Sequence, residues 1–128
     1  MANELLLFID FDGVLHPEPC SDDEYFCKTP LLWQILRTCE NISVVFSTSW
    51  RHLYSFEALV DGVTRGGGEN LAHRFAGKTP TIRSHSDYEP RGVECQHWLE
   101  ANGHSDAVWL ALDDTRHNFH GGQLHRIN

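Results

Sequence analysis

The strongest constraint on the fold is a short run of apolar residues that ends in two carboxylates. Residues 5–9 are all apolar, and Asp10, Asp12 and Gly13 follow them directly. Such a run is typical of a strand at the centre of a parallel sheet, whose ligands bind beyond the carboxyl ends of the strands. Residues two apart on a strand point to the same side, and glycine permits a sharp turn. The run therefore predicts that both carboxylates face one pocket at the edge of a sheet.

Two further apolar runs also stop at polar residues. Residues 42–46 lead into Ser47, and residues 107–112 lead into the pair Asp113 and Asp114. Between them, Arg91 begins a segment whose apolar residues have helical spacing and which closes with an Asn-Gly pair. We expect the ends of these strands to bring carboxylates, hydroxyls and one guanidinium to the same cleft.

These segments resemble the four ordered motifs of the haloacid dehalogenase (HAD) superfamily. The matching residues are Asp10-Phe11-Asp12-Gly13-Val14, Ser47, Arg91 and Asp113-Asp114. In more detail, Ser47-Thr48-Ser49-Trp50-Arg51 and Ala111-Leu112-Asp113-Asp114 resemble the HAD-like branch associated with Swiss Army Knife RNA-repair proteins. The resemblance implies an α/β, Rossmann-like three-layer sandwich with a central, mainly parallel sheet. Family members usually carry lysine in the third motif, so Arg91 departs from the pattern and Lys78 is the competing candidate.

The resemblance also implies a phosphatase that hydrolyses phosphomonoesters with Mg²⁺. In it, Asp10 is the nucleophile that forms an aspartyl-phosphate, and Asp12 is the general acid and base. Closely packed carboxylates require a hard divalent cation with oxygen ligands. The expected metal ligands are Asp10, Asp12, Asp113 and Asp114, with Asp114 favoured over Asp113 for direct contact. The expected phosphate-binding residues are Ser47, Thr48, Ser49, Arg51 and Arg91.

Charge and spacing bear on the substrate, which the sequence does not identify. The stretch between Asp12 and Ser47 holds little more than a flap and one helix, which predicts no separate cap domain and an open site. The formal net charge is −8, so the basic footprint of a protein that grips long polynucleotides is missing. A cluster of the basic residues near the cleft would favour a nucleotide or nucleic-acid end, and scattered basic residues would favour a small phosphorylated metabolite. Those residues are Arg51, Arg65, Arg74, Lys78, Arg83 and Arg91.

Two readings other than a general phosphatase stay open. One is a phosphatase that processes nucleic-acid ends, and the other is a noncatalytic module that binds phosphate or a partner. A metal site built on His117, His120 and His125 is disfavoured, because their spacing does not match a standard zinc module. No protein partner can be inferred from the sequence.

Composition is consistent with one modest domain over residues 1–128. Of these residues, 41% are hydrophobic, and the apolar runs are too short to span a bilayer. The early apolar stretch lacks a basic leading region, so we expect a cytoplasmic protein without a signal peptide. The pattern further predicts a helix capped by Thr29 before Pro30, a helix whose inner face includes Leu53 and Leu59, and a short strand over residues 80–83.

Overall fold

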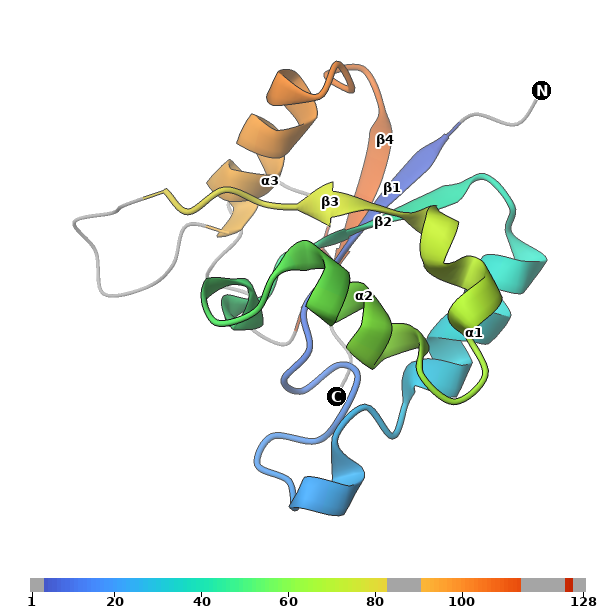
Figure 1. The fold of residues 1–128 in the computed structure, drawn as a ribbon. Helices are drawn as coiled ribbons and strands as arrows, with labels where there is room; N and C mark the ends of the chain where they lie inside the picture. The colour runs from blue at the N-terminus through green and yellow to red at the C-terminus, as the bar shows by residue number, and fades with distance from the viewer. Residues whose placement is uncertain (1–3, 83–90, 114–123, 126–128) are drawn as a thin grey trace.

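The computed structural model describes residues 4–82, residues 91–113 and the backbone of residues 124–125. Its described part contains a five-stranded sheet in the order β3-β2-β1-β4-β5, with every pair parallel. Figure 1 shows the central strand flanked by its neighbours. The strands are β1 (Leu5–Ile9), β2 (Ile42–Phe46), β3 (Phe75–Lys78), β4 (Val108–Leu112) and β5 (Leu124–His125). The α/β fold predicted from the sequence is confirmed.

The register of the three central strands aligns their carboxyl ends. Ile9, the last residue of β1, lies opposite Phe46 in β2 and Leu112 in β4. The residues that follow these ends continue the pairing: the Asp10 N–H donates to the Leu112 carbonyl at 3.0 Å, and the Ser47 N–H donates to the Ile9 carbonyl at 2.9 Å. Asp10, Ser47 and Asp113 therefore emerge at one level of the sheet edge.

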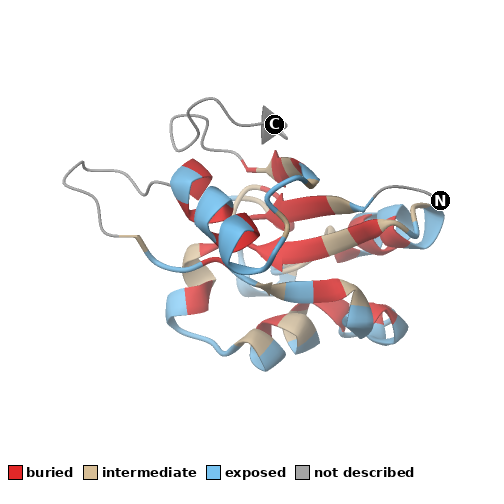
Figure 2. Cartoon of the chain, turned by 90° about the horizontal axis from the view of Figure 1, so that it is seen from above, coloured by how far each residue is buried: buried red, intermediate tan, exposed pale blue. Residues whose placement is uncertain are grey.

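Helices cover both faces of the sheet and bury two apolar clusters. On one face, Leu7 and Ile9 belong to a cluster with residues of α1 (Thr29–Thr38) and α2 (Phe56–Thr64). On the other face, Phe8 packs edge-on against Trp98 of α3 (Arg91–Ala101), with ring centroids 6.0 Å apart. Burial on both faces explains why the residues of β1 are continuously apolar (Figure 2).

In the described part of the chain, three short 3₁₀ helices lie in the loops that join these elements. They are η1 (Asp22–Glu24), η2 (Ser49–His52) and η3 (Glu69–Arg74). Between Asp12 and Ser47 the chain forms a turn, η1, α1 and β2, so this stretch holds no separate cap domain. No helix in the described ranges is long and apolar enough to cross a membrane.

Three details of the predicted elements were wrong. Thr29 is the first residue of α1 and not its cap, since Lys28 occupies the N-cap. Leu53 precedes α2 and is 81% exposed, because the Ser55 side chain accepts from the Ala58 N–H and starts the helix later. Residues 80–82 form no strand, because the edge strand β3 ends earlier, at Lys78, and residue 83 lies outside the described residues. The strand β3 was missed because Ala76, Gly77 and Lys78 have low strand propensity.

Candidate active site

The buried half of the site is an ion-pair group at the carboxyl ends of β1 and β4. Arg91, the first residue of α3, places its Nη1 2.6 Å from Asp10 Oδ2 and 2.9 Å from Asp113 Oδ2. The same nitrogen donates to the Ser47 carbonyl at 3.1 Å. Asp10 and Asp113 are 4% and 1% exposed. One guanidinium thus links the ends of β1, β2 and β4, and it does so from the position that the sequence assigned to the third motif.

The environment of Asp10 favours its neutral form more than water does. Burial raises the pKa of the Asp10 carboxyl to about 7, because an ionised carboxylate loses hydration there. The Arg91 guanidinium is the strongest opposing influence, while the nearby Asp113 carboxylate adds to the rise. The Phe11 N–H also opposes it by donating to Asp10 Oδ1 at 2.7 Å. Two buried carboxylates therefore share the Arg91 guanidinium.

Asp12 forms the more accessible half of the site. Its side chain is 34% exposed, and the following Gly13 has a φ of 80° that turns the chain away from the strand. The His16 Nε2 lies 2.8 Å from Asp12 Oδ1. The Trp50 indole N–H reaches both carboxylate oxygens at 3.3 Å. Two ring nitrogens, from His16 and Trp50, therefore hold the Asp12 carboxylate.

The hydrogen bonds of His16 show which of its two ring nitrogens carries the proton. The ring is fully buried, and its Nδ1 accepts the Phe26 N–H at 3.3 Å. A backbone N–H can only donate, so Nδ1 is the acceptor and the ring proton lies on Nε2. His16 therefore donates to Asp12. Phe26 has a φ of 60°, which is uncommon for a residue with a side chain, and this conformation aims its N–H at the ring.

Residues 47–49, which follow β2 and all carry hydroxyl groups, differ in how far they are buried. Ser47 is 1% exposed, and its hydroxyl oxygen lies 3.9 Å from the Cys95 Sγ. Thr48 is fully buried and caps η2 by accepting the Trp50 N–H at 3.3 Å. Ser49 is partly exposed and lines a pocket beside Trp50. The Thr48 hydroxyl therefore caps the helix, and the expected phosphate contacts of these three residues stay predictions.

Arg51 is engaged within the protein, and the expected contact of this residue with phosphate stays a prediction. Its Nη2 lies 2.8 Å from Glu94 Oε2, and both side chains are almost completely buried. Its remaining groups donate to the carbonyls of Thr48 at 2.7 Å and Thr79 at 3.1 Å. The pair was not predicted, because Arg51 and Glu94 lie 43 positions apart in the sequence and meet only through the packing of α3. We therefore assign Arg51 a structural role.

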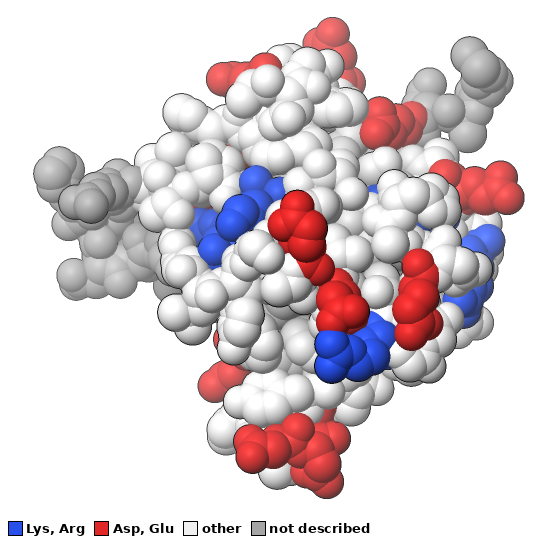
Figure 3. Space-filling view, in the orientation of Figure 1, with Lys and Arg blue, Asp and Glu red and all other residues white. Residues whose placement is uncertain are grey.

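The other basic residues of the described part do not gather around the cleft. Arg65 pairs with Asp61 on the exposed side of α2. Arg74 donates to the Ile42 carbonyl at 3.0 Å, at the opposite edge of the sheet. Lys78 is exposed at the end of β3, so Arg91 and not Lys78 takes the place beside Asp10. In Figure 3, basic side chains on the visible face occur in separate groups among acidic ones.

The donor chemistry of the edge fits a hard cation, although its ligand set is only partly described. Within the described ranges, no three His, Cys, Asp or Glu side chains lie close enough together to hold a metal ion. Asp114, the favoured ligand, lies outside the described residues, as do His117 and His120. Asp10 and Asp113 nevertheless offer oxygen donors at the ends of β1 and β4. Carboxylate oxygens are ligands that suit Mg²⁺.

Sequence reasoning missed the partners that hold Asp12. The sequence pattern singles out neither His16 nor Trp50 as a contact of this carboxylate. A buried histidine four residues beyond Asp12 is a weak signal by itself. The contact of Trp50 depends on the placement of η2, which brings residue 50 next to residue 12.

The fold and the order of the site residues define a Rossmann-like α/β protein of the HAD type. Asp10 and Asp12 follow β1, Ser47 follows β2, Arg91 begins α3 and Asp113 follows β4. A family model described as the HAD domain in Swiss Army Knife RNA repair proteins matches residues 6–127, and the chain belongs to this family. No curated protein and no solved structure matched the chain.

Proposed function

We propose that the chain is a Mg²⁺-dependent phosphomonoester hydrolase that works through an aspartyl-phosphate on Asp10. Support comes from its membership of a HAD family and from the pair of carboxylates at the end of β1. The observation that carries the proposal is their unequal environment. Asp10 is buried against a guanidinium, whereas Asp12 is a third exposed and held by two ring N–H groups. Such a difference separates a nucleophile from a proton-transfer group.

In the first proposed step, an Asp10 oxygen attacks phosphorus and the bond to the ester oxygen breaks. Asp12 donates a proton to the departing oxygen, so that the alcohol leaves neutral. In the second step, a water molecule attacks the phosphoryl group, Asp12 accepts its proton and the bond to Asp10 breaks. Inorganic phosphate and the free Asp10 carboxylate result. Splitting the reaction lets one pair of carboxylates serve as nucleophile and as acid and base.

The neighbouring groups support the charges in this reaction. Arg91 offsets the charge of the phosphoryl oxygens, and Ser47 with nearby amides supplies hydrogen-bond donors. Asp10, the Asp12 carbonyl and Asp113 or Asp114 would hold Mg²⁺, which supplies Lewis-acid polarisation of the phosphoryl group when it is bound. Arg91 also keeps the Asp10 oxygen fixed at the strand end, since its Nη1 lies 2.6 Å from Oδ2.

A narrower candidate substrate is a phosphorylated nucleic-acid end. The description of the matching family, whose HAD domains occur in RNA repair proteins, favours it over a general metabolite. The scattered basic residues of the described part favour instead a small phosphorylated substrate, and they argue against a tight grip on a long backbone. We therefore expect contact to be limited to the terminal nucleotides.

The test is phosphate release from small phosphomonoesters, nucleotides and oligonucleotides with 3′- or 5′-phosphates, in Mg²⁺ and in chelator. Wild type, Asp10→Asn and Asp106→Asn are compared, the last as an isosteric control at an exposed position in the loop before β4. We expect release to require Mg²⁺ and Asp10 and to survive Asp106→Asn. Equal release by wild type and Asp10→Asn would refute the mechanism, and binding of phosphate without release from any substrate would favour the noncatalytic reading.

A further inference from the structure

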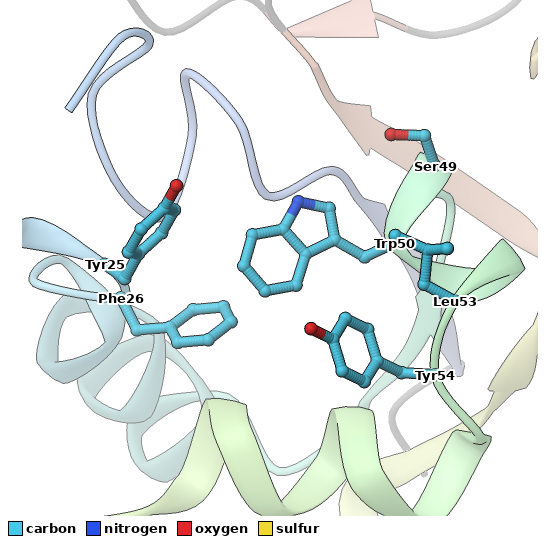
Figure 4. A pocket seen from close by; sticks show the side chains of 6 residues that line it. All are labelled: Tyr25, Phe26, Ser49, Trp50, Leu53 and Tyr54. Carbon is cyan, nitrogen blue, oxygen red and sulfur yellow. The ribbon is translucent and has the colours of Figure 1, made fainter. Parts of the chain in front are cut away.

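An aromatic pocket is lined in part by Trp50, whose indole N–H contacts Asp12, and the proposed reaction steps do not use the space inside it. Its volume is about 560 Å³, within the range of small-molecule sites in proteins. In Figure 4, Tyr25 and Phe26 lie on one side of the Trp50 ring, and Ser49, Leu53 and Tyr54 lie on the other. The first two residues come from the η1–α1 connection, and the others come from η2 and the two positions after it. The lining residues are Tyr25, Phe26, Ser49, Trp50, Leu53 and Tyr54.

The pocket holds apolar surface that the core does not use. Tyr25 is 44% exposed, Leu53 81% and Tyr54 50%, and they make up three of the seven exposed large hydrophobic side chains in the described part. Their gathering at one pocket is informative, because exposed apolar residues are unremarkable only when they are scattered singly. The tyrosine rings present apolar faces together with hydroxyl groups. Such walls suit a planar ligand with polar edges.

The rings are arranged as walls around Trp50. The Trp50 ring centroid lies 5.7 Å from that of Tyr25 and 5.8 Å from that of Tyr54, with interplanar angles of 66° and 32°. The Phe26 centroid is 5.2 Å away at 61°. These edge-on and tilted contacts fix the rings against one another. Because Tyr25 and Tyr54 remain about half exposed, they have ring surface left for another planar group.

The pocket is joined to the catalytic carboxylate through one side chain. Trp50 lines it and also donates its indole N–H to Asp12 at 3.3 Å. Asp12 is the group proposed to protonate the departing oxygen. The part of a substrate that carries this oxygen is therefore the part nearest the aromatic walls.

Electrostatics favour a ligand recognised by its planar face. The chain carries a net charge of −8. Arg51 pairs with Glu94, Arg65 with Asp61 and Arg74 with backbone carbonyls, so these guanidinium groups are engaged within the protein. Stacking of a nucleobase on an aromatic ring needs no basic surface and tolerates every base.

We propose that this pocket binds the nucleobase adjacent to the scissile phosphate, so that the substrates are nucleotides or nucleotide ends of nucleic acids. The inference rests on the proposed function for the identity of the scissile group. It adds a base-stacking subsite formed by Tyr25, Trp50 and Tyr54. Because stacking does not distinguish the four bases, the subsite selects for a nucleotide and not for a sequence.

The test measures equilibrium binding by calorimetry in the Asp10→Asn background with Mg²⁺, where the expected lack of turnover keeps the ligand intact. The probes are adenosine 5′-monophosphate, ribose 5-phosphate and phosphotyrosine. Tyr54→Ala removes a ring, Tyr54→Phe keeps it, and Leu31→Ala removes a 60% exposed apolar side chain on α1 as a matched control. Thermal unfolding of each variant verifies that it is folded.

We expect Tyr54→Ala to weaken adenosine monophosphate binding about 5- to 140-fold, the range measured for one lost base stack. In Tyr54→Ala, the ratio of the affinity for adenosine monophosphate to the affinity for ribose 5-phosphate should fall by the same factor. In Tyr54→Phe, this ratio should return to the value of the protein with Tyr54. Leu31→Ala should leave the ratio within about twofold, as for surface positions in general. Undetectable nucleotide binding, an unchanged ratio in Tyr54→Ala, or tighter binding of phosphotyrosine than of the nucleotide would each overturn the subsite.

A second set of binding measurements distinguishes a free nucleotide from a nucleotide at the end of a nucleic acid. A 3′- or 5′-phosphorylated oligonucleotide that binds like the mononucleotide, with a shallow dependence on salt, indicates that only the terminal residue is held. A steep salt dependence would assign the affinity to the backbone and overturn stacking as its source. Because binding is measured apart from phosphate release, ring-dependent nucleotide binding without turnover contradicts the proposed function alone.

Discussion

The buried pair of Arg51 and Glu94 gives the sharpest prediction about stability. The two side chains are 2% and 1% exposed, and Nη2 lies 2.8 Å from Oε2. The guanidinium also donates to three backbone carbonyls, while Glu94 accepts the Ile82 N–H at 2.9 Å. The pair therefore joins η2 to α3 and to the chain after β3. It thereby stabilises the relative positions of Ser47, which lies just before η2, and Arg91, which begins α3.

Replacing Arg51 with methionine keeps much of the side-chain volume but removes the cation from a buried carboxylate. Breaking such a pair from one side costs about 3–5 kcal/mol. For a domain whose whole stability is about 5–15 kcal/mol, this is a large fraction. At roughly 3–5 °C for each kcal/mol in a chain of this size, we expect the Tm of Arg51→Met to fall by about 10–20 °C.

Denaturant and thermal unfolding of four variants test this reasoning. Arg51→Met is compared with Glu94→Met, with the double variant and with Arg65→Met. The double variant should recover most of the loss, because both charges are then gone. Arg65→Met should cost less than about 1 kcal/mol, since its pair with Asp61 is exposed on both sides. A loss for Arg51→Met as small as that for Arg65→Met, together with a raised KM, would instead assign Arg51 to substrate binding.

Three further outcomes are expected. Arg91→Lys should lower kcat/KM for phosphate release about 10- to 100-fold, because an ammonium cannot reproduce the guanidinium contacts; unchanged kinetics would contradict this. Burial raises the pKa of Cys95 to about 12, so native protein should be alkylated at exposed Cys27 and not at Cys95, as mass spectrometry can verify. The raised pKa of Asp10 means that the folded protein holds a proton that the unfolded chain releases. In chelator, wild type should therefore lose stability relative to Asp10→Asn as the pH rises from about 4 to about 7, and a flat difference in Tm would refute this.

The parts of the fold that follow from local pattern were predictable. The apolar run of β1 and the polar residues after β2 and β4 identify the strand ends, and parallel pairing then brings them to one edge. The pair of Arg51 and Glu94 was not predictable, because it joins residues 43 positions apart through the packing of α3 on the sheet. Leu53 was wrongly placed in the second helix because it has helical spacing from Phe56. The Ser55 cap begins α2 only after Leu53.

The site was predictable in its carboxylates but not in what orients them. Asp10 and Asp12 could be found because they follow a strand directly. The partners of Asp12 come from separate loops, and their contacts depend on a turn at Gly13 and on the conformation of Phe26. Loop conformations of this kind are set by tertiary contacts and carry little periodic signal.

The site divides into two parts that are constrained in different ways. Asp10 and Asp113 are fixed by strand register and by one buried guanidinium, so their positions cannot change without disturbing the sheet. Asp12 is held instead by loop residues, and Phe26 connects its anchor His16 to the aromatic pocket. The orientation of the proposed acid and the walls of the proposed nucleobase subsite thus depend on the same loop contacts. Under the proposed function, changes in these loops would therefore alter the choice of leaving group and the proton transfer together, while Asp10, the proposed nucleophile, stays in place.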